Sequence, residues 1–150
     1  MWEPYLRATL PAPKEEDRVQ LEALAGSSLP PGYWELVMAH QDEALDHDLV
    51  QDPGFEAFIL LLVLPPERLE KANASYSVAS VVEQIMPLYP ARLLPFTDDT
   101  GGNFWTFDYR ANPAVPSIVF INHELKGEEG VTAVAPDFAS LFARIGLTSR

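Results

Sequence analysis

The sequence contains no cysteine, which excludes disulfides, thiolate-bound zinc and iron–sulfur clusters. Basic residues are few, because 10 Lys and Arg stand against 22 Asp and Glu, and the formal net charge is −12. Phosphate backbones and anionic membrane surfaces repel a chain of this charge. We therefore expect no direct binding to nucleic acid or to a membrane.

Long hydrophobic runs are also missing. The longest apolar run, residues 55–64, is broken by Glu56 and is about half of the ~20 residues that a membrane-spanning helix needs. The N-terminus carries Glu3 and Pro4 where a secretory signal would have an apolar segment. These features predict a cytoplasmic protein whose apolar residues form a core.

Motifs of enzymatic chemistry are absent from the sequence: it has no nucleophile elbow, no H-E-x-x-H and no phosphate loop. Their absence favours a non-enzymatic binding role, and we expect no cofactor and no metal. At 150 residues and 47% hydrophobic content, the chain can bury roughly two-thirds of its unfolded surface around one core. We predict a loose N-terminal arm over residues 1–13 and a single domain over residues 14–150.

Helical patterns precede and follow a run of short strand patterns. The predicted helices cover residues 14–25, 31–40, 65–74, 78–85 and 136–146. Residues 58–64 fit a strand covered on both faces or a short buried helix. Further strands are predicted near residues 91–96, 103–109, 117–122 and 131–135, and a helix end plus loop over residues 41–53. The first helix offers Val19, Leu21 and Leu24 as its apolar positions, and the second offers Tyr33, Trp34, Val37 and Met38.

This order of elements predicts an α+β fold, with one mainly antiparallel sheet packed on one face by the N-terminal and C-terminal helices. A doubly wound parallel sheet needs long helical crossovers between its strands. The connections between the late strands are too short for them.

Residues 97–103, with the sequence TDDTGGN, can be interpreted as an acidic metal loop, a phosphate-binding turn or a hairpin turn. Aromatic strand residues follow this segment, where a phosphate loop has a helix and usually a Lys. We predict a hairpin turn held by Asp98 and Asp99, with Gly101 or Gly102 at positive φ. Asp108 is predicted to hold the next turn through hydrogen bonds to the backbone.

His40, Glu43 and His47 would lie along one side of a continuing helix as possible metal ligands. Zinc sites usually add ligands from elsewhere in the chain, so we interpret this segment as a solvated helix end.

Acidic residues dominate the first half of the chain. No basic residue occurs between Arg18 and Arg68, whereas this interval holds Glu22, Glu35, Asp42, Glu43, Asp46, Asp48, Asp52 and Glu56. Such a surface can serve solubility alone or can bind a basic partner. Trp34, Trp105 and Tyr109 are candidate aromatic anchors, although aromatic residues on strands are more often part of the core.

Several short motifs resemble the SUKH superfamily, which is named partly after yeast Smi/Knr regulators of cell-wall glucan synthesis. They are Leu29-Pro30 followed by Tyr33, Gly101-Gly102 followed by an aromatic strand ending at Asp108, and Val134-Ala135 followed by Phe138. An apolar strand leading to Leu64 and Leu69, and SIVFINHE over residues 117–124, also match. The resemblance covers residues 15–147, and it departs at residues 40–43, where many members have an Asn-Gly turn.

The resemblance implies a bacterial immunity protein, part of a toxin–immunity pair, that neutralises a toxin such as a nuclease. An acidic surface would then occlude the basic active surface of the toxin. We predict that this surface includes Asp42, Glu43, Asp46, Asp48, Asp52 and Trp34. The alternatives are a regulatory scaffold, as the yeast members imply, and a metal-dependent hydrolase using Asp98, Asp99, Asp108 or His123.

Overall fold

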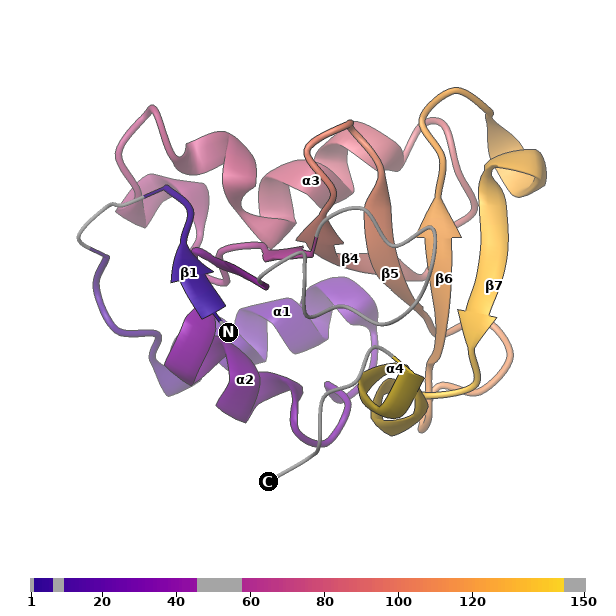
Figure 1. Ribbon diagram of the computed structural model, residues 1–150, viewed down its shortest axis with the longest axis horizontal. Coiled ribbons are helices and arrows are strands. Elements are labelled where there is room, and N and C mark those ends of the chain that lie inside the picture. Colours follow the sequence, from indigo (N-terminus) through magenta and orange to yellow (C-terminus); the bar gives the residue numbers. More distant parts are fainter. Residues whose placement is uncertain (1, 7–9, 46–57, 145–150) are drawn as a thin grey trace.

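The computed structural model describes residues 2–6, 10–45 and 58–144 (Figure 1). Within these residues, one antiparallel sheet has its strands in the order of the sequence, each paired with the next. The strands are β1 (Trp2–Pro4), β2 (Glu43–Leu45), β3 (Ile59–Leu60), β4 (Leu93–Asp98), β5 (Phe104–Asp108), β6 (Ser117–Ile121) and β7 (Val131–Ala135).

Helices lie between the strands of this sheet and after its last strand, which confirms the predicted α+β fold. They are α1 (Glu15–Ala25), α2 (Tyr33–His40), α3 (Val78–Ile85) and α4 (Phe138–Arg144). Short 3₁₀ turns occur at η2 (Pro66–Arg68), η3 (Ala74–Tyr76) and η4 (Gly127–Gly130). No helix among the described residues is long and apolar enough to cross a membrane.

Aromatic rings join the helices to the middle of the sheet. The ring of Tyr33 on α2 lies 5.0 Å from that of Phe107 on β5, and 6.1 Å from both Phe96 on β4 and Phe138 on α4. The Phe96 and Phe107 rings stack at 4.1 Å. Consecutive residues of β4 and β5 are buried, so both faces of these strands are covered. Figure 1 shows α3 behind these two strands.

The inner face of α1 differs from the prediction. Val19 and Leu24 are 56% and 46% exposed, whereas Asp17, Leu21 and Ala25 are buried. Asp17 lies inside because Arg68 donates hydrogen bonds to both of its carboxylate oxygens. The inner face of α1 therefore includes a charged residue, which apolar spacing alone does not predict.

The N-terminal segment contributes a strand to the sheet. Trp2 pairs with Leu45 and Pro4 with Glu43, which makes β1 an edge strand of the sheet. The division of the chain into an arm and a domain stays a prediction.

Two segments, one after α2 and one after β3, differ in structure from the prediction. The helix α2 ends at His40 and β2 begins at Glu43, where we expected a helix end and loop over residues 41–53; residues 46–53 lie outside the described part of the chain. After β3, Leu62 forms a parallel bridge with Ser77. The helix predicted over residues 65–74 is replaced by η2 and turns.

Candidate protein-binding surface

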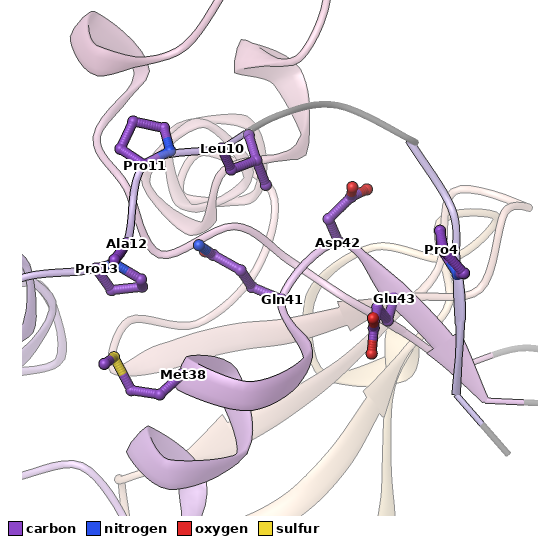
Figure 2. Close-up of a pocket in the computed structure, with 9 residues that line it drawn as sticks. All are labelled: Pro4, Leu10, Pro11, Ala12, Pro13, Met38, Gln41, Asp42 and Glu43. Carbon is purple, nitrogen blue, oxygen red and sulfur yellow. The ribbon is translucent and has the colours of Figure 1, made fainter.

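A surface groove of about 700 Å³ lies between the N-terminal segment and the end of α2 (Figure 2). One side consists of Pro4 and residues 10–13, which are Leu, Pro, Ala and Pro. The other side is formed by the last turn of α2 and the first residues of β2, namely Met38, Gln41, Asp42 and Glu43. The groove therefore combines apolar walls with two of the acids that the sequence singled out.

Asp42 has a structural task in this groove. It is 6% exposed, and its backbone has a φ of 69°, which is uncommon for a residue with a side chain. Its carboxylate accepts a hydrogen bond from Leu6 N–H at 2.6 Å, and its carbonyl accepts one from Tyr5 N–H at 2.8 Å. Asp42 thus holds the N-terminal segment beside β2.

Glu43 and His40 form a second contact at the same edge. The Nδ1 atom of His40 lies 2.6 Å from Oε1 of Glu43. The His40 ring also stacks on Trp2, with 4.6 Å between ring centroids. Figure 2 shows the carboxylates of Asp42 and Glu43 pointing to opposite sides, as expected for neighbours near the start of a strand. Glu43 is half-buried and remains the more accessible of the two.

The helix α2 presents its outer residues near the groove. Met38 is 50% exposed, and Glu35, one turn earlier, is exposed. Trp34 is half-buried and packs against the core. The remaining predicted contacts, Asp46, Asp48 and Asp52, lie outside the described residues.

The segment 97–103 comprises the last two residues of β4 and the turn that leads to β5. Asp98 accepts a hydrogen bond from Thr100 N–H at 2.8 Å, and Asp99 accepts hydrogen bonds from Gly101 N–H and Asn103 N–H. Gly102 has a φ of 86°, whereas Gly101 does not have a positive φ. Burial raises the pKa of Asp98, the hydrogen bond from Thr100 opposes this effect, and the nearby Asp99 adds to it.

Asp108 lies at the end of β5 and binds Arg110 through the backbone N–H at 2.9 Å and through two side-chain nitrogens at 3.0 and 2.9 Å. Burial alone would raise the pKa of Asp108. The hydrogen bonds from Arg110 have the larger, opposite effect, so the pKa of Asp108 lies below its usual value. Arg110 also pairs with Glu128 of η4. The Arg110 guanidinium therefore joins Asp108 at the end of β5 to the loop that holds Glu128.

The family landmarks occupy central places in this fold. Tyr33 is at the centre of the aromatic cluster, Gly102 supplies the turn before β5, and Phe138 begins α4. The chain matches the model of the SMI1 / KNR4 family (SUKH-1) over residues 12–144, which is nearly its whole length. It belongs to this family. No curated protein and no solved structure matched the chain.

SUKH proteins are typically non-catalytic immunity proteins, and membership of the family implies a protein partner such as a toxin. Two of the candidate anchors belong to the core of this SUKH domain instead of its surface. Trp105 is buried on β5, and the hydroxyl of buried Tyr109 donates to the carbonyl of Ser28 at 3.1 Å. Burial raises the pKa of Tyr109, and the charge of Glu22 adds to the effect.

The metal hypothesis needed one continuous helix through His40, Glu43 and His47. That helix ends at His40, Glu43 belongs to β2, and His47 lies outside the described residues. Among the residues that the structure describes, no group of three or more His, Asp or Glu side chains could hold a metal ion.

Sequence reasoning missed the apolar side of the groove in this SUKH domain. The signal was the run LPAP at residues 10–13, because alternating prolines favour an extended segment. Met38 was assigned to a buried helical face, but it lines the groove.

Proposed function

We propose that this protein is an immunity protein that binds a basic toxin domain and blocks its active surface. The observation that carries the proposal is a groove with acidic residues on one side, in a SUKH domain with a net charge of −12. Toxins that act on nucleic acid need a basic surface, and an acidic protein attracts such a surface over a long range.

The proposed contact surface consists of Glu43, Trp34 and Met38 together with Asp46, Asp48 and Asp52. Glu43 and the three aspartates supply negative charge, whereas Met38 and the prolines of the groove can pack against the aliphatic stem of a lysine or arginine. Asp42 supports this surface from below, because its carboxylate is buried.

Inhibition of this kind requires no chemistry from the immunity protein. Charge attraction speeds the encounter, to ~10⁸ M⁻¹s⁻¹ or more at low salt, and a small central contact then slows dissociation. The bound protein excludes the substrate of the toxin.

The proposed function predicts that a gene near that of this protein encodes a toxin, and the first experiment measures binding to the domain of that toxin. The variant Asp46→Lys/Asp48→Lys/Asp52→Lys should associate more slowly, with a weaker dependence on salt. The control variant Glu70→Lys/Glu83→Lys/Glu129→Lys makes the same change of charge at exposed residues elsewhere. Equal effects of the two variants would exclude the acidic segment as the interface.

A second variant tests the groove itself. Met38→Arg places a bulky cation on an exposed position, so the fold should tolerate it. We expect dissociation of the toxin to become about tenfold faster or more. Unchanged dissociation would remove the groove from the interface. Capture of a cell-wall synthesis or signalling protein in place of a toxin would favour the regulatory role instead.

A further inference from the structure

His123 is an exposed side chain whose orientation is unusually well defined. It follows β6, and its ring lies against Gly102 of the neighbouring hairpin, where an added Cβ would be 3.5 Å from two ring atoms. Its Nδ1 atom is 2.7 Å from Oδ1 of Asn103, and its backbone N–H donates to the same oxygen at 2.9 Å. Asn103 therefore holds both the backbone and the ring of His123.

The orientation of the Asn103 amide follows from its two neighbours. Its Nδ2 atom is 2.9 Å from Oδ2 of Asp99, and a carboxylate can only accept a hydrogen bond. Its other amide atom receives the backbone N–H of His123, so that atom must be the oxygen. Asp99 is itself held in place by Gly101 N–H and Asn103 N–H.

The protonation of the neutral His123 ring follows from this amide. Because Nδ1 faces an amide oxygen, Nδ1 must carry the proton. The lone pair of the neutral ring then lies on Nε2. The buried Asp99 and the half-buried Asn103 thus give an exposed histidine a hydrogen-bond acceptor of defined position.

The surroundings of His123 favour a positively charged donor. Two acids lie on these hairpins: Glu124 is exposed next to His123 in the sequence, and Asp98 is half-buried at the end of β4. The β6–β7 loop also holds one basic residue, Lys126.

We propose that Nε2 of His123 accepts a hydrogen bond from a lysine or arginine side chain on the basic surface of the protein partner. This inference rests on the proposed function and adds the ends of the β4–β5 and β6–β7 hairpins to the proposed contact surface. In this role Asp99 and Asn103 are positioning residues, and His123 makes the contact.

The first test uses the free protein and needs no partner. A long-range ¹H–¹⁵N correlation spectrum of the histidine rings at neutral pH should show His123 with its proton on Nδ1. In Asn103→Ala, which loses the acceptor, the signals should move toward the mixture that a free histidine shows. A proton on Nε2 in the wild-type protein would overturn the proposal.

The second test measures dissociation from the toxin domain used above. His123→Phe keeps a planar ring but removes the acceptor, so we expect binding to weaken about tenfold. His123→Gln can place an amide oxygen near the position of Nε2 and should retain most of the affinity. Gln84→Ala, at an exposed position of α3, is the control.

The outcomes separate the two proposals. If the wild-type protein binds the toxin and His123→Phe binds equally well, the histidine contact is wrong and the immunity function stands. If the wild-type protein does not bind the toxin, the proposed function fails and the contact fails with it, whatever the ring spectrum shows.

Discussion

Arg68 donates hydrogen bonds to both carboxylate oxygens of Asp17, at 2.6 and 2.7 Å, although 51 residues separate them in the sequence. The Asp17 side chain is 1% exposed, and it also accepts the N–H of Lys14 at 2.8 Å. One carboxylate therefore both caps the start of α1 and joins that helix to η2.

Removal of one partner from this ion pair should destabilise the fold. Asp17→Ala leaves the Arg68 guanidinium without its acceptor and removes the cap of α1, so we expect a loss of about 3 kcal/mol in the free energy of unfolding. Urea denaturation measures this loss. Glu16→Gln, which changes an exposed acid of the same helical turn, should have little effect.

The double variant Asp17→Leu/Arg68→Met completes this test. Apolar residues that replace both charges should restore part of the stability, because no buried charge is left unpaired. If the double variant lost as much free energy of unfolding as Asp17→Leu and Arg68→Met together, the ion pair would not be the source of the loss.

Tyr33→Phe should stabilise the protein. The Tyr33 hydroxyl is fully buried and has no hydrogen-bond partner among the described residues, so the folded state carries its desolvation cost. We expect a gain of about 1 kcal/mol, measured by thermal or urea unfolding.

Tyr109→Phe is the matched control, because its hydroxyl donates to the Ser28 carbonyl. Removal of the Tyr109 hydroxyl leaves the Ser28 carbonyl without this donor and should lower the free energy of unfolding by about 1 kcal/mol. Changes of the same sign in both variants would contradict this account.

Asp108→Asn should change how stability depends on pH. Burial raises the pKa of Asp108 and the hydrogen bonds from Arg110 lower it more, so its folded pKa is below its unfolded value. The unfolded state then binds more protons, and the stability from this carboxylate is present above about pH 4 and is lost as the pH falls through the folded pKa. The variant should be less stable at neutral pH and should lose less on acidification. Urea denaturation at several pH values measures this. If the free energy of unfolding of the variant fell on acidification as much as that of the wild type, the prediction would be wrong.

Asp98→Asn should have the opposite effect. Burial and the neighbouring Asp99 raise the folded pKa of Asp98 against the opposing hydrogen bond from Thr100. The folded state then binds more protons, so ionisation of this carboxylate costs stability as the pH rises above about 4. Asparagine can still accept the Thr100 N–H. We expect equal or greater stability than the wild type at pH 7 and no such gain at low pH, as read from melting temperatures.

The strands from Leu93 onward were predictable because each one is short, apolar and bounded by turn residues, and each pairs with its neighbour in the sequence. The helix α3 was predictable for a similar reason, since Val78, Val81, Val82 and Ile85 share one face. Local pattern and tertiary structure agree in these elements.

The errors arose where a distant partner decides the local structure. Apolar spacing cannot reveal that Arg68 draws Asp17 inside, or that Leu45 pairs with Trp2. The candidate site suffered from the same limit: the acids at residues 42 and 43 were identified, but their different burial depends on Leu6 and His40. A sequence pattern identifies a charge and leaves its partner unspecified.

The strict sequence order of the strands has a consequence for folding kinetics. The turn between Asp98 and Phe104 closes a short loop, and the sheet from β4 to β7 grows by such local steps, which cost little chain entropy. By contrast, β1 must find β2 from the other end of a long segment that includes two helices. We therefore expect the late strands to assemble first and Trp2 to dock last, so the wall of the groove formed by the N-terminal segment is completed only at the end of folding.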